Sequence, residues 1–184
     1  MRFPILVSRG RAAAITFFEL VPRPQSAFVL TDDLSMNMED SPAAFDYFML
    51  AAKRFFPNIL LWQLDWPQEE QATLRAALSL RKLCRIIGDS WTMPLLFAFD
   101  CLQRGRNWPV RVLVSGAMRQ CRGVRCVSIG GVLNKLRRAE ALRSLLYLPR
   151  ANVLALQRRG VDVGNCVILP PNVKQCLDIW RERT

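Results

Sequence analysis

Two short stretches of the sequence contain residues able to do acyl-transfer chemistry. Gly88, Asp89 and Ser90 come directly before the apolar run WTMPLLFAF, and Lys135 follows a Gly-Gly pair at the start of a second helical stretch. A serine hydroxyl is a weak nucleophile at neutral pH and needs a base within hydrogen-bond reach. A helix start offers it free backbone N–H groups and the positive end of a dipole. Ser90 is therefore either an ordinary N-cap or a nucleophile.

The base in such a site cannot be histidine, because the chain has none. This excludes Ser-His and Cys-His triads and leaves a carboxylate, a lysine or a metal-bound water. A lysine is a base only when neutral, and burial can lower its reference pKa near 10.4 by the roughly three units required. The sequence has few lysines, and Lys135 stands out because it follows a glycine turn. The composition permits a Ser–Lys dyad without selecting this pair.

The length and composition predict one domain with one core, since 51% of the 184 residues are hydrophobic. The longest apolar runs are shorter than the roughly 18 residues of a membrane span, and the apolar start MRFPILVSRGR is too short for a signal peptide. We expect a cytoplasmic protein that does not contact a membrane. The six cysteines include no C-x-x-C pair, so we expect a reducing compartment, no metal and no other cofactor.

The net charge of +11 has two interpretations. Basic residues gather in the second half of the chain, which is typical of a surface for nucleic acid or acidic substrates, or of a solvated face. No nucleic-acid motif accompanies the charge, so we favour the solvated face.

The residue patterns predict a mixed order of strands and helices, and an α+β or α/β sandwich fits this order. We expect a hairpin of segments 12–20 and 26–30 with Pro22 and Pro24 in its turn, and a helix that Ser41 caps and Pro42 opens. The remaining expected strands are 58–64, 110–116, 124–131 and 165–170, and the remaining helices are 67–87, 90–103, 132–146 and 172–180.

The stretch VLVSGAMRQCRGVRCVSIGGVLNK resembles the signature of Lon-type proteolytic domains, in which a strand ending in T-G-E leads through R-G-x-V-x-x-I-G-G to a helix with a lysine. The matching positions are Ser115-Gly116, Arg122-Gly123-Val124, Ile129-Gly130-Gly131 and Lys135. Gly88-Asp89-Ser90 is similar to the start of the family's G-D-S-A-S motif. LTDDLSMNMEDSPAAFDYF is similar to its T-G-x-L-x-x-x-M-x-E-S-x-x-A entry into the first helix. The likeness extends from about residue 10 to 170.

The resemblance implies a role for each matching residue. Ser90 would be the nucleophile and Lys135 its base, with the Ser115 hydroxyl orienting the lysine. The backbone N–H groups of Asp89 and Ser90 would form the oxyanion hole, and Asp89 would be an auxiliary or a helix cap. The chain would be a single Lon-like domain, 1–184, with an inserted helix at about 67–87 and an extended segment at about 143–163.

The implied function is that of an ATP-independent endopeptidase acting on peptides or unfolded proteins, because the sequence has no Walker A motif. A homo-oligomer and a separate partner that delivers substrate fit this function. Two positions depart from the family: Trp91 replaces a small residue, which predicts a narrowed or closed cleft, and Ala117 replaces the acid of T-G-E. The alternatives are a catalytically inactive Lon-fold binding or scaffold protein, with Trp91 filling the cleft, and a basic adaptor that contacts nucleic acid.

Overall fold

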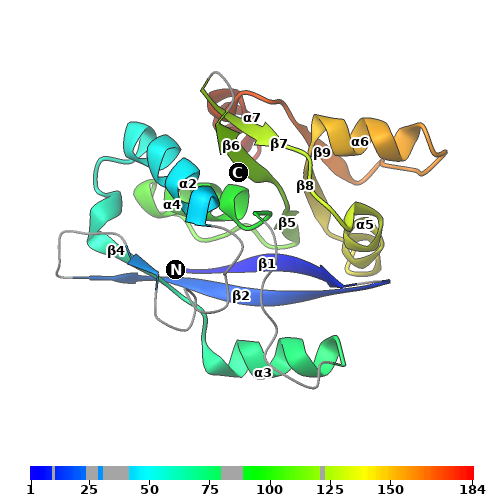
Figure 1. Cartoon of the computed structure of the whole chain (residues 1–184), viewed down its shortest axis with the longest axis horizontal. Helices are drawn as coiled ribbons and strands as arrows, with labels where there is room; N and C mark the ends of the chain where they lie inside the picture. Colours follow the sequence, from blue (N-terminus) through cyan, green and yellow to red (C-terminus); the bar gives the residue numbers. More distant parts are fainter. Residues whose placement is uncertain (10, 24–28, 31–41, 80–88, 121–122) are drawn as a thin grey trace.

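The computed structural model describes residues 1–9, 11–23, 29–30, 42–79, 89–120 and 123–184 (Figure 1). The described strands are β1 (Arg2–Arg9), β2 (Ala12–Pro22), β3 (Val29–Leu30), β4 (Trp62–Asp65), β5 (Val112–Val114), β6 (Ala117–Gln120), β7 (Val124–Val127), β8 (Leu145–Pro149) and β9 (Cys166–Leu169). The described helices are α2 (Pro42–Phe55), the short 3-10 helix η1 (Ile59–Leu61), α3 (Gln68–Ala77), α4 (Thr92–Gln103), α5 (Val132–Ala141), α6 (Arg150–Gln157) and α7 (Val173–Arg183). The α+β class is confirmed.

The first sheet has the strand order β1-β2-β4-β3 and corrects the predicted hairpin. The partner of β2 is the N-terminal segment β1, which pairs with it antiparallel over its whole length, whereas β3 lies parallel to β4. Phe3, Ile5 and Leu6 of β1 are buried. The apolar start of the chain is thus a core strand, because its hydrophobic side chains are stabilised by burial when β1 pairs with β2.

The second sheet is parallel, with the order β5-β8-β9, and the antiparallel ribbon β6–β7 is inserted after β5. The helix expected over 132–146 overlaps only the first two residues of the central strand β8. Helix α5 instead ends at Ala141, and Arg143 adopts a left-handed φ of 50° that reverses the chain. The expected extended segment 143–163 is therefore β8 followed by α6. Residues 146–149 of β8 are buried, as is typical of a central parallel strand covered on both faces, and this explains their apolar run.

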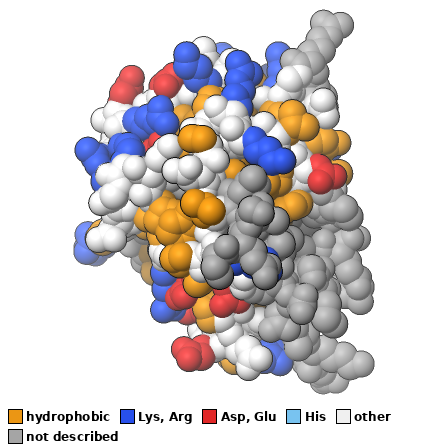
Figure 2. Space-filling model, turned by 90° about the vertical axis from the view of Figure 1, so that its left-hand side faces the viewer, with side chains coloured by type: hydrophobic (Ala, Val, Ile, Leu, Met, Phe, Trp, Pro, Cys, Tyr) orange, Lys and Arg blue, Asp and Glu red, His pale blue; other side chains and the backbone are white. Residues whose placement is uncertain are grey.

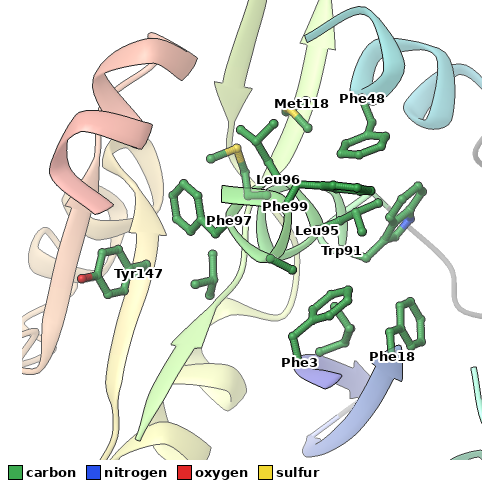
Figure 3. Close-up of a cluster of buried hydrophobic side chains, with 14 of the residues drawn as sticks. Phe3, Phe18, Phe48, Trp91, Leu95, Leu96, Phe97, Phe99, Met118 and Tyr147 are labelled. Carbon is green, nitrogen blue, oxygen red and sulfur yellow. The ribbon is translucent and has the colours of Figure 1, made fainter. Parts of the chain in front are cut away.

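Helix α4 lies in the middle of the molecule, with β1 and β2 on one side and α2 and β6 on others (Figures 1 and 3). Residues 92–101 are all buried. A helix that is apolar on every side is a core helix, and Phe97 stacks on Trp180 of α7 with ring centroids 4.5 Å apart. Helix α3 covers the opposite face of the β1–β2 pair (Figure 1). None of the described helices is both long and apolar enough to cross a membrane.

Several expectations fall partly outside the described residues. These are the Ser41 cap, the turn at Pro24, most of the likeness at 30–48, the end of the predicted 67–87 helix, and Gly88 and Arg122 of the two motifs. Within the described part, the 67–87 helix is present as α3, and the helix expected from Ser90 begins at Thr92.

Candidate active site

Three side chains from separate segments converge at one point. The Lys135 Nζ atom of α5 donates hydrogen bonds to Ser90 Oγ at 3.1 Å and to Ser115 Oγ at 2.9 Å. Ser90 lies in the turn before α4, and Ser115 directly follows β5. The structure thus brings the predicted nucleophile, base and orienting hydroxyl together.

The Lys135 amine is held in a dry environment. Only 3% of the residue is exposed, and burial lowers the pKa of its ammonium from 10.5 to about 7 because the charged form is desolvated. Among the described residues, no carboxylate forms an ion pair with it. A large fraction of the amine is therefore neutral at neutral pH, and its lone pair can accept a proton from a hydroxyl.

Gly131 positions Lys135 by letting α5 begin close to β1. Gly131 has a left-handed φ of 63°, and a Cβ atom there would lie 1.9 Å from Ser8 Oγ. Its carbonyl accepts the first-turn hydrogen bond from Lys135 N at 3.2 Å. Only glycine fits both the conformation and the approach, so this turn sets where the lysine enters the site.

Asn152 of α6 fixes the chain just before this turn. Its side-chain amide donates to Ile129 O at 2.9 Å, and its Oδ1 accepts from Ile129 N at 3.0 Å. The Asn152 side chain is buried, and the two hydrogen bonds are partly buried. Nothing in the sequence singles out Asn152, because the contact spans two elements and no motif predicts it.

Thr92, which the sequence motifs also missed, holds the nucleophile's turn. Its N and Oγ1 both donate to Asp89 O, at 3.1 and 2.9 Å, and Oγ1 accepts from Met118 N at 3.0 Å. Gly116 N also donates to Ser90 O at 3.3 Å. The turn is thereby tied to the start of β6. A threonine two residues after a candidate nucleophile, at the start of an apolar run, is the sequence signal that could have found Thr92.

The expected oxyanion donors, the backbone N–H groups of Asp89 and Ser90, precede the first residue of α4 by three and two positions. Among the described residues, none accepts a hydrogen bond from Ser90 N. This N–H lies near the positive end of α4, where a developing negative charge is stabilised. The Asp89 carboxylate points elsewhere: its Oδ2 lies 3.6 Å from Arg119 Nε of β6. Asp89 thus contributes its backbone to the turn and its charge to an ion pair.

Trp91 packs in the hydrophobic core, and the expectation that it narrows the cleft stays a prediction. Its side chain is 1% exposed and lies in the core against Phe48, with ring centroids 6.4 Å apart (Figure 3). The turn at Asp89–Thr92 directs Ser90 toward Lys135 and the neighbouring indole inward. A large apolar side chain next to the nucleophile therefore anchors the turn in the core.

No protein family model matches the chain, and no curated protein matches it significantly. Among the described residues, no group of three or more cysteine, aspartate and glutamate side chains could hold a metal ion. What the site can do follows from its own chemistry, that of a serine hydroxyl beside a desolvated amine.

Proposed function

We propose that this protein is a Lon-like serine endopeptidase with a Ser90–Lys135 dyad, acting in the cytoplasm without ATP or a cofactor. The observation that carries the proposal is the contact of Lys135 Nζ with Ser90 Oγ at 3.1 Å, together with a burial-lowered pKa of about 7. A neutral amine within hydrogen-bond distance of a serine hydroxyl can act as the base for nucleophilic attack in a chain without histidine.

In the acylation step, Ser90 Oγ attacks the carbonyl carbon of the scissile peptide bond while its proton passes to Lys135 Nζ. The carbonyl oxygen becomes an oxyanion, which the N–H of Ser90 and the positive end of α4 stabilise. When the C–N bond breaks, the Lys135 ammonium returns the proton to the leaving amine. The products are an ester on Ser90 and a peptide with a new amino terminus.

In the deacylation step, the neutral Lys135 amine takes a proton from a water molecule that attacks the ester carbonyl. The C–O bond to Ser90 then breaks, the proton passes to Ser90 Oγ, and the second product leaves with a carboxyl group. Throughout both steps, Ser115 Oγ accepts a hydrogen bond from Lys135 Nζ at 2.9 Å. This contact keeps the amine oriented while its protonation state changes.

The proposed substrates are peptides or unfolded proteins, and a homo-oligomer and a substrate-delivering partner remain part of the proposal. The scaffold alternative assumed that Trp91 fills the cleft. Trp91 is buried, and the labelling experiment below distinguishes the enzyme from the scaffold.

The test is covalent labelling by a fluorophosphonate probe, which reacts with activated serines. We expect the purified protein to be labelled at a rate that rises with pH around a midpoint of about 7, because only the neutral amine of Lys135 activates Ser90. Ser90→Ala should abolish labelling, and Lys135→Met should remove both the activity and the pH dependence. Mass spectrometry identifies the modified residue.

The matched control is Ser128→Ala, which removes an exposed hydroxyl from the segment after β7. This variant should be labelled as the unmodified protein is. A folded protein that takes up no probe between pH 6 and pH 9, or a pH profile unchanged in Lys135→Met, would contradict the dyad.

A further inference from the structure

Two arginine side chains lie opposite each other on the β6–β7 ribbon near the candidate nucleophile. Arg119 and Arg125 are direct partners in this antiparallel pair, and both are exposed. Side chains at opposed positions project from the same face of a ribbon, with Cβ atoms about 4.5–5.5 Å apart, and like charges placed so are destabilising. The ribbon therefore presents two positive charges that an anion would stabilise.

Asp89 neutralises this pair of charges only in part. Its Oδ2 lies 3.6 Å from Arg119 Nε, and the Arg119 side chain is 64% exposed against 17% for Asp89. In the part of the chain that the structure describes, no carboxylate forms an ion pair with Arg125. The charge most accessible to an approaching molecule is thus positive. Since Asp89 directly precedes Ser90, this surface begins beside the candidate nucleophile.

We propose that Arg119 and Arg125 are specificity-determining residues that select acidic peptide segments. An Asp or Glu side chain near the scissile bond would pair with their guanidinium groups. A planar guanidinium can donate two parallel hydrogen bonds to one carboxylate. This specificity rests on the proposed peptidase function. Because both arginines are exposed, each pair is expected to change binding on the order of 1.5- to 5-fold, less at high salt.

The experiment measures how competing peptides protect Ser90 from a neutral fluorophosphonate probe at low ionic strength. Three peptides of equal length share an Ala/Leu sequence and differ in two positions, which are Glu, Gln or Lys. We expect the Glu peptide to slow labelling at a concentration about 3- to 10-fold below that of the Gln peptide, and the Lys peptide to protect least. The double variant R119Q/R125Q should remove this order.

The control must account for the general basic charge, since lysine and arginine side chains are also spread over the face shown in Figure 2. The matched variant is R158Q/R159Q, which removes two adjacent exposed arginines from the end of α6. It lowers the net charge by the same amount and should keep the preference for the Glu peptide. A preference lost equally in both double variants would overturn the assignment to the ribbon.

Two further outcomes overturn the inference while leaving the peptidase intact. One is a Glu peptide that protects no better than the Gln peptide while the probe labels Ser90 normally. The other is equal protection by single-stranded oligothymidylate, which would make the ribbon a general polyanion surface. Labelling by the probe alone, without a competing peptide, does not involve an acidic group. If the probe alone fails to label the protein, the proposed peptidase function is contradicted, and the proposed specificity with it.

Discussion

At the level of the residue, Lys135 is unusual because its amine is buried and, among the described residues, no carboxylate forms an ion pair with it. Leu136 and Ala139 of the same helix are buried in the cluster between α5 and β8. The two serine hydroxyls that the amine contacts are neutral. An ion pair with a carboxylate would have held the charged form and raised the pKa. The same desolvation that makes the amine a base therefore opposes folding whenever the amine is protonated.

This cost predicts how stability depends on pH. The folded chain releases the Lys135 proton near pH 7, whereas the unfolded chain holds it up to about 10.5. The unfolded state thus binds more protons between these values, and the free energy of unfolding rises with pH by up to about 1.4 kcal/mol per unit. In Lys135→Met this contribution is absent. Urea denaturation at pH 7.5 and pH 9.5 compares the two proteins, and parallel pH dependences would contradict the buried neutral amine.

At the level of the element, the site depends on where helices begin. Helix α5 begins at a left-handed glycine against Ser8 of β1, and α4 begins at a threonine bonded to Asp89 and β6. Neither start uses an exposed capping side chain. Each uses a contact with another element instead, so the position of each helix along its axis is set by the sheet that it faces.

Gly131→Ala should therefore lower the free energy of unfolding by more than a glycine substitution that only strains the backbone. The left-handed conformation costs an alanine about 1–2 kcal/mol, and the contact with Ser8 adds about 1–3 kcal/mol. Gly160→Ala is the matched control, because Gly160 has a similar φ of 68° with nothing within 4 Å of the added Cβ. Chemical denaturation should show the larger loss for Gly131→Ala.

Ser8→Gly removes the side-chain atoms that the added methyl group of Gly131→Ala would contact. In that background, the extra cost of Gly131→Ala over Gly160→Ala should largely disappear, as a double-mutant cycle measures it. Equal losses for the two alanine variants in the original background would show that close approach to β1 does not position α5.

At the level of the whole molecule, one aromatic core connects the two sheets through α4. Aromatic rings pack around this helix (Figure 3). They come from β1 (Phe3), β2 (Phe18), α2 (Phe48) and the turn before α4 (Trp91), and Phe97 of α4 itself joins the same cluster. The Ser90 turn is thus attached to the core by the very next residue. Packing of the whole molecule, in addition to local hydrogen bonds, holds the candidate nucleophile in place.

Trp91→Phe tests this arrangement, because a phenyl ring keeps part of the packing. We expect a loss of stability of about 1–3 kcal/mol, while fluorophosphonate labelling below the unfolding transition changes less than about twofold. Thermal denaturation and labelling of the same sample check both. Faster labelling by bulky probes without loss of stability would mean that the indole obstructs the site.

The sequence alone determined the chemistry available and the general class of the fold. With no histidine and few lysines, the composition makes Lys135 a candidate base, whereas its pairing with Ser90 and Ser115 is implied only by the resemblance to Lon-type domains. These are local properties: composition, helix periodicity and turn residues act within a few positions of the chain.

Tertiary structure decided the partner of β2, the central-strand conformation of 145–149, and the inward direction of Trp91. It also decided the lowered pKa of Lys135 and the contacts of Thr92 and Asn152. Each of these depends on atoms far apart in the chain. Strand pairing, desolvation and buried hydrogen bonds have no fixed sequence spacing, so they become definite only when the whole core has packed.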